Sequence, residues 1–151
     1  MLKARTVKWM LNLFPPLFFN RIRITSLSKD FRLLKVRVRS SLMNRNLQRS
    51  IFGGTIFSAA DPYYAIMYWQ IFAHEGMKTE AWLKEAQIEY IKPAKSHLEL
   101  IFSISEEEVA DAKIQLKESG KFSRWHRVEA KDQKGEVVAV IKTLVYLRLK
   151  G

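Results

Sequence analysis

Two adjacent glycines and a single carboxylate mark the stretch of this sequence whose residue types best suit catalysis. The segment Ile51 to Asp61 contains Gly53 and Gly54, and Asp61 is its only charged residue. Adjacent glycines let a backbone approach a ligand closely, and the first turn of a helix leaves N–H donors without internal partners. Such donors suit a carbonyl oxygen that gains negative charge. A carboxylate on the same helix, or on a twofold-related copy, can then act as base or nucleophile.

The same residues also have purely structural interpretations. Gly53 and Gly54 are equally suited to a loop that enters a helix with close packing. Asp61 can be a carboxylate bonded within a subunit interface, or one paired with an arginine such as Arg49. An isolated carboxylate in an apolar helix is costly to bury, so we expect it to be paired, exposed to a cleft or raised in pKa.

The surrounding sequence predicts the elements that position these residues. High apolar density from Gly54 to about His74 predicts a long, largely buried helix, which Pro62 kinks immediately after Asp61. Alternating polar and apolar residues predict strands at about 20–28, 32–40, 82–90, 98–104, 122–131 and 137–149. A further helix begins at Ser105, with Glu108 at the capping-box position, and ends at Gly120. Residues 41–53 lack periodicity and are expected to form a loop.

This order predicts an α+β protein in which six mainly antiparallel strands wrap around one long helix. A length of 151 residues with 48% hydrophobic residues fits one domain over 1–151. The first residues, about 1–19, are expected to form an amphipathic helix, with a basic opening that ends at Pro15 and Pro16. Its apolar part is too short to span a bilayer and lacks a small-residue cleavage site, whereas contact with a membrane surface stays open.

The net charge of +11 lies in the first third of the chain, because residues 1–50 contain twelve Lys and Arg but only one acid, Asp30. Nucleic acid, an anionic membrane and phosphate-bearing ligands all suit such a region. Alternation in segments such as 35–39 also allows these charges to be simple outward strand positions. The absence of cysteine excludes disulfides and thiolate metal sites, and the spacing of the three histidines predicts structural roles rather than a metal site.

The element order and the Gly-Gly to Asp segment together resemble the hotdog-fold thioesterase superfamily over most of the chain. Its phenylacetate-pathway type carries the pattern Asn-x-x-Gly-x-x-His-Gly-Gly, followed by an apolar turn and Ala-Asp. The matching residues here are Asn46, Gly53, Gly54, Phe57, Ala60 and Asp61. Arg49 stands in place of the first glycine, and Phe52 stands in place of the histidine. The segments 12–16, 44–46, 52–54 and 60–62 look like an uncharacterised group of the same superfamily.

The resemblance implies a sheet order of 1-2-4-5-6-3, with the strand at 82–91 as the edge that pairs across a twofold axis. It implies a homodimer or a tetramer, with Gly53 and Gly54 of one protomer facing Asp61 of the other. Acyl-coenzyme A is the implied substrate, so that coenzyme A enters as part of the substrate and no separate cofactor is expected. The residues expected to contact substrate are Asn46, Arg49, Ser50, Phe52, Phe57 and Tyr64.

The sequence thus favours a thioesterase that hydrolyses an acyl-coenzyme A thioester. One alternative is a noncatalytic protein that binds an acyl chain or acyl-coenzyme A in a tunnel lined by Phe57, Tyr63, Tyr64 and Met67, although these residues suit a core equally well. Another is a basic module that binds nucleic acid or an anionic membrane. Few exposed aromatic residues accompany the bases, so nucleic acid is not expected as a partner. We expect a cytoplasmic protein.

Overall fold

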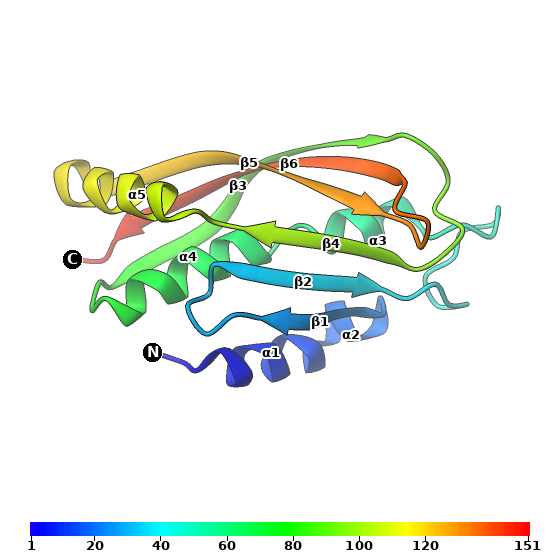
Figure 1. The fold of residues 1–151 in the computed structure, drawn as a ribbon, viewed down its shortest axis with the longest axis horizontal. Helices are drawn as coiled ribbons and strands as arrows, with labels where there is room; N and C mark the ends of the chain where they lie inside the picture. The colour runs from blue at the N-terminus through cyan, green and yellow to red at the C-terminus, as the bar shows by residue number, and fades with distance from the viewer.

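The computed structural model describes all residues, 1–151, and contains five helices and six strands (Figure 1). In chain order they are α1 (Ala4–Leu13), α2 (Pro15–Phe19), β1 (Ile22–Leu27), β2 (Leu33–Val38), α3 (Gly53–Ser58), α4 (Tyr63–His74), β3 (Thr79–Tyr90), β4 (Leu98–Ser103), α5 (Glu106–Ser119), β5 (Lys121–Lys131) and β6 (Val137–Leu149). The strands form one antiparallel sheet in the order β1-β2-β4-β5-β6-β3. The predicted α+β class and the sheet order implied by the resemblance are confirmed.

Alternation along the strands separates a core face of the sheet from an outer face. In β2, Leu34, Val36 and Val38 are buried, whereas the residues between them point to the other side. The basic residues of the first two strands therefore lie at outward positions, as their alternation with aliphatic residues predicts. The strands β1, β2, β4, β5 and β6 supply apolar side chains to a single buried cluster that also contains Val7 of α1 and most of α4. Ala81 and Ile88 of β3 pack against this cluster but are only partly buried.

The predicted single helix from Gly54 to His74 is wrong in one respect, because the chain forms two helices with a break between them. The helix α3 ends where Ala60 N–H donates to the Phe57 carbonyl at 3.0 Å, a tighter turn than an α-helix makes. Pro62 then serves as the residue that precedes α4, where its missing N–H is tolerated. Asp61 consequently lies in an irregular segment between two helices and not within one continuous kinked helix.

The helix α4 is apolar on nearly every side and is the centre of the core. Its buried residues are Tyr63, Tyr64, Ala65, Met67, Tyr68, Gln70, Ile71 and Phe72. Aromatic rings from the sheet pack on it, with Phe102 of β4 5.1 Å from the Tyr63 ring and Phe122 of β5 5.4 Å from the Tyr68 ring. A helix that is apolar on all sides needs a surrounding sheet, because exposing any of its faces to water would cost hydrophobic free energy.

The two edges of the sheet differ. Figure 1 shows α1 and α2 lying alongside β1, where the Asn12 side chain accepts from the Ile24 N–H at 2.7 Å and donates to its carbonyl at 3.1 Å. These bonds satisfy edge groups of β1 that no strand pairs with. The other edge is β3, twelve residues long, which pairs only with β6. Long unpaired edges invite pairing with another chain.

Several local signals of the sequence are confirmed. Ser105 and Glu108 form the predicted capping box at the start of α5, and Gly120 ends the helix in the left-handed conformation with a φ of 73°. The predicted helix at 1–19 is divided into α1 and α2, since the residue before a proline disfavours the helical conformation and Phe14 is extended. No helix in the structure is both long enough and apolar enough to cross a membrane.

We expect Asn12→Ala to lower the free energy of unfolding by about 1–3 kcal/mol, because it leaves buried backbone groups of Ile24 without partners. Urea unfolding followed by circular dichroism measures this change. Asn12→Asp is the matched variant, since it keeps an acceptor for the Ile24 N–H but sets a carboxylate oxygen against the Ile24 carbonyl, and its loss at neutral pH should be at least as large. Equal stability of Asn12→Ala and the wild type would show that α1 does not depend on these bonds.

Candidate functional site

The helix α3 begins with two backbone donors that have no partner within the chain. The Phe52 carbonyl accepts from Thr55 N–H at 2.9 Å and from Ile56 N–H at 3.4 Å. The N–H groups of Gly53 and Gly54 donate to no protein group. Both glycines are only half-buried. The predicted pair of free donors at the start of a helix is therefore present in the single chain.

Packing explains why both positions carry glycine. A Cβ at Gly53 would lie 2.9 Å from the Cζ and hydroxyl oxygen of Tyr90, and one at Gly54 would lie 2.6 Å from Cε1 of Phe52. The Tyr90 hydroxyl also donates to the Gly53 carbonyl at 2.8 Å. The end of β3 thus fixes the start of α3, and the Phe52 ring lies against Gly54. Nothing in the sequence signals the Tyr90 contact, because the two residues are 37 positions apart.

Asp61 is exposed between α3 and α4, and its carboxylate makes no hydrogen bond or ion pair. In particular, it does not pair with Arg49, which also forms no ion pair. Partial shielding from water by neighbouring atoms raises the pKa of Asp61 above its ordinary value of 3.8. An unpaired carboxylate with a raised pKa is a stronger base than an ordinary aspartate, which suits the role that the sequence suggests.

Within one chain, the glycines and Asp61 lie at opposite ends of α3. With a rise of about 1.5 Å per residue, the helix separates Gly54 from its last residue, Ser58, by about 6 Å, and Asp61 lies three residues further along the chain. A group that polarises a carbonyl oxygen and a group that acts on the carbonyl carbon must each lie about 3 Å from the reacting atoms. Gly54 and Asp61 therefore lie toward opposite ends of a short helix, an arrangement that suits the predicted site in which each group comes from a different protomer.

The side chains of Asn46 and Ser50 hold together the loop that leads to α3. Asn46 Oδ1 accepts from the N–H groups of Gln48 at 3.0 Å and Ser50 at 3.1 Å, and its amide donates to the Ser50 hydroxyl at 2.9 Å. Between them, Arg49 adopts a φ of 62°, a left-handed conformation that glycine adopts without strain. The loop keeps this turn although arginine occupies the position where the resemblance has glycine.

The remaining predicted contact residues are not grouped together. Phe52 is exposed, Phe57 is half-buried and Tyr64 is buried in the core. The Tyr64 ring stacks on the His126 ring with centroids 4.2 Å apart and meets Phe102 at 5.1 Å. The proposed tunnel residues Tyr63 and Met67 are also fully buried in the single chain. Contact of these residues with a substrate stays a prediction.

The structure adds a buried polar cluster around His126. Its Nε2 lies 3.2 Å from the Tyr68 hydroxyl, and its Nδ1 lies 3.9 Å from Oε1 of Glu108. Burial lowers the pKa of His126 to about 4, so the imidazole is neutral at physiological pH. The alternation of β5 places position 126 inward with positions 122 and 128, and this pattern could have located His126 in the core. The contacts support the structural role that the sequence predicts for it.

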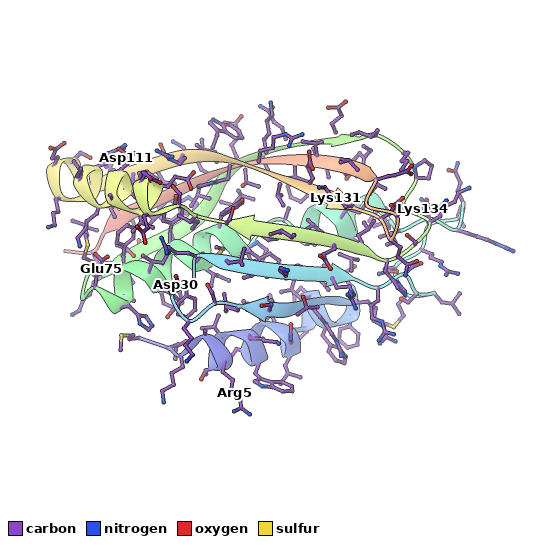
Figure 2. The ribbon with its side chains drawn as sticks, viewed as in Figure 1. Arg5, Asp30, Glu75, Asp111, Lys131 and Lys134 are labelled. Atoms are coloured by element: carbon purple, nitrogen blue, oxygen red, sulfur yellow. The ribbon has the colours of Figure 1, made fainter.

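The single chain has a surface cavity on the outer face of the sheet, away from α3. A cavity of about 710 Å³ is lined by residues of β2, β4 and β5 and the β5–β6 turn, among them Arg37, Arg127 and Lys131. Figure 2 shows Lys131 and Lys134 at this turn. None of its lining residues is a predicted site residue. The structure contains no group of three or more His, Asp or Glu side chains that could hold a metal ion.

Solved structures share this arrangement of sheet and helices. PA5026 from Pseudomonas aeruginosa, a protein of unknown function described as a probable thioesterase, matches with a TM-score of 0.86 and 19% identity over 99% of this chain and 97% of that chain. PaaI from the phenylacetic acid degradation operon of E. coli matches with a TM-score of 0.66 and 17% identity over 97% and 92%. Thioesterase HI1161 from Haemophilus influenzae matches with a TM-score of 0.72 and 5% identity over 99% and 92%.

The protein has the hotdog fold, as its sequence resemblance predicts, and shares this fold with the three solved structures, of which HI1161 is a thioesterase. Residues 3–147 match the family described as "Domain of unknown function (DUF4442)", and the chain belongs to that family. No curated protein matches the chain. The predicted likeness to an uncharacterised group within a thioesterase fold is therefore confirmed.

We expect the free energy of unfolding to fall as the pH drops from about 6.5 toward about 4, in part because of His126. The folded chain binds this proton less tightly than the unfolded chain, so protonation in this window favours unfolding. Thermal melts across the window measure the effect, and His126→Gln should reduce the slope. His74→Gln, at an exposed histidine, is the control. An unchanged slope in His126→Gln would contradict the assignment.

Proposed function

We propose that this protein hydrolyses an acyl-coenzyme A thioester at a site formed by two copies of the chain. The observation that carries the proposal is a pair of complementary groups at the two ends of α3. Gly53 and Gly54 offer unpaired N–H donors, and Asp61 offers an unpaired carboxylate of raised pKa. A thioesterase with the same fold, HI1161, adds support at the level of reaction class.

In this proposal, the Gly53 and Gly54 amides of one protomer bind the thioester carbonyl oxygen and stabilise the negative charge that develops on it. Asp61 of the partner subunit either takes a proton from the attacking water or attacks the carbonyl carbon itself. The carbon–sulfur bond breaks, water supplies the new acyl oxygen, and the coenzyme A sulfur leaves as the thiol. The products are a carboxylic acid and free coenzyme A.

Phe52 takes the place of a hydrogen-bonding histidine and must act differently. Its ring lies against Gly54 and is largely exposed, so it presents an apolar surface beside the two free donors. Such a ring can pack against an acyl chain and exclude water, but it cannot donate a hydrogen bond to the substrate. We infer that substrate orientation depends on the backbone donors and on apolar contact.

The open edge at β3 supports the association of two chains. Several large apolar side chains around this edge and the start of α3 are exposed in the single chain, namely Leu47, Phe52, Trp69, Trp82, Tyr90 and Ile91. Exposed apolar patches of this kind mark surfaces that associate. Pairing of two β3 edges would satisfy unpaired backbone groups and cover part of this surface.

A noncatalytic acyl-binding protein is the second candidate, and the position of Phe52 favours it. The ring contacts Gly54 closely, so a substrate carbonyl can reach the Gly54 donor only if the ring leaves that side open. Saturable binding of acyl-coenzyme A without release of thiol would support this candidate. A thiol-release assay over acyl groups of different length and aromatic character separates the two.

We expect Asp61→Asn to remove most thiol release while leaving stability at neutral pH equal to or above that of the wild type. The amide cannot act as base or nucleophile, and it avoids the partial desolvation that raises the pKa of the carboxylate. Glu118→Gln makes the same chemical change at an exposed acid of α5 and should have no effect. Unchanged turnover by folded Asp61→Asn would contradict the assignment of Asp61 as base or nucleophile. In the wild type, activity should decline with acid at a pH above 3.8.

We expect two inactive variants to restore activity when their subunits are mixed. Asp61→Asn lacks the carboxylate, and Gly53→Val displaces the donors because its side chain meets Tyr90. Refolding equal amounts together should recover about a quarter of wild-type activity, since half of the dimers are hybrids and each hybrid has one intact site of two. Each variant refolded alone is the control. Absence of recovery in mixed dimers of confirmed composition would contradict a site shared between protomers.

A further inference from the structure

The outer face of α1 and α2 carries apolar side chains that the chain itself does not cover. Six large ones lie within eleven residues, with exposed fractions between 38% and 63%, and we call them the N-terminal apolar face: Trp9, Met10, Leu13, Phe14, Phe18 and Phe19. At helical spacing, Arg5, Trp9 and Leu13 line one side of α1. The opposite side, with Val7 and Leu11, already packs on the core. The helix is therefore apolar on two faces, of which only one has a partner.

This face is held outward by specific contacts. Asn12 bonds to both backbone groups of Ile24, and Lys8 Nζ donates to the Thr25 carbonyl at 2.8 Å. At the start of the chain, Leu2 N–H donates to Gln70 Oε1 at 3.2 Å. Rotation of α1 to bury its outer side chains would break these bonds and expose Val7. The apolar face is consequently a fixed feature of the surface.

Cations without partners surround the N-terminal apolar face. Lys3, Arg5, Arg21 and Arg23 are exposed and form no ion pair. No acidic residue occurs before Asp30, and that carboxylate is already paired with Arg32 at 3.1 Å. Figure 2 shows Arg5 extending away from α1 and from the rest of the molecule. The surface thus combines apolar bulk with uncompensated positive charge.

We propose that the N-terminal apolar face binds the surface of an anionic lipid bilayer. A helix with large apolar residues on one side and flanking Lys and Arg lies in the interface, with its rings at the boundary between headgroups and acyl chains. The cations beside it are attracted to anionic headgroups. The proposal rests on residues separate from α3 and Asp61, so it stands independently of the proposed enzymatic function.

The charge distribution argues against a second copy of the chain as the occupant. A twofold contact of this face with itself would bring Arg5 and Lys3 of both copies together, and such like-charge contact without intervening acids is unfavourable. Nucleic acid would satisfy the cations and could stack on the aromatic rings of this face, but it would leave Met10 and Leu13 without apolar contact. An anionic bilayer satisfies both the charges and the apolar surface.

Cosedimentation of the protein, residues 1–151, with lipid vesicles tests the proposal. We expect binding to vesicles of phosphatidylcholine with phosphatidylserine, and much weaker binding to phosphatidylcholine alone. The double variant Trp9→Ser, Phe19→Ser should lose most of the binding. Trp125→Ser changes an exposed tryptophan of β5 and should bind like the wild type. Arg5→Glu should weaken binding more than about fivefold, because one interfacial cation contributes about that factor and the substitution also adds an anion. Lys134→Glu, on the distant β5–β6 turn, is the control and should not weaken binding.

Thermal melts and size measurements on each variant distinguish the outcomes. Absence of vesicle binding by the wild type would overturn the proposal, and so would equal binding by the wild type and the folded double variant. If the double variant instead changes the oligomeric state, a second copy covers this face and the proposal is wrong. Binding of a single-stranded oligonucleotide that Arg5→Glu weakens, without vesicle binding, would assign the face to nucleic acid.

Discussion

The fold depends on the burial of α4, a helix that is apolar on almost every side. Its aromatic residues cannot be covered by another helix alone, so the six-stranded sheet curves around it and supplies rings such as Phe102 and Phe122. The sheet leaves Trp69 of the same helix exposed, together with the β3 edge. Burial of α4 thus determines how the sheet packs within the single chain. It also leaves an exposed apolar surface that suits contact with a second copy of the chain.

One edge of the sheet, at β1, is covered by α1, whereas the other edge, at β3, is left unpaired. At β1, the Asn12 amide reproduces the hydrogen bonds of a missing strand, so α1 ends the sheet. This arrangement turns the second apolar side of α1 toward solvent. At β3, nothing in the chain pairs with the outer backbone groups. The covered edge therefore creates the surface proposed to meet lipid, while the open edge creates the surface proposed to meet a partner subunit.

The break between α3 and α4 gives Asp61 its chemical character. In a continuous helix the residue would lie against apolar neighbours, and its carboxylate would need a partner. In the irregular segment before Pro62 it is exposed and unpaired, while nearby atoms still raise its pKa. The same short helix α3 presents free donors at its other end. The six-residue helix α3 therefore lies between the two groups of the proposed reaction, with the free donors at its start and Asp61 just beyond its end.

By itself, the sequence determined most elements of this protein, because their signals are local. Alternation identified the strands, Ser105 and Glu108 identified the start of α5, and the Gly-Gly to Asp pattern identified the family resemblance that gave the sheet order. The division of the long helix was missed, since a proline can either kink or end a helix and only the surrounding packing decides between them. Tertiary structure alone brought Tyr90 to Gly53, paired His126 with Tyr68 and left β3 open. These contacts join residues far apart in the chain, and no local pattern encodes which distant groups a folded core brings together.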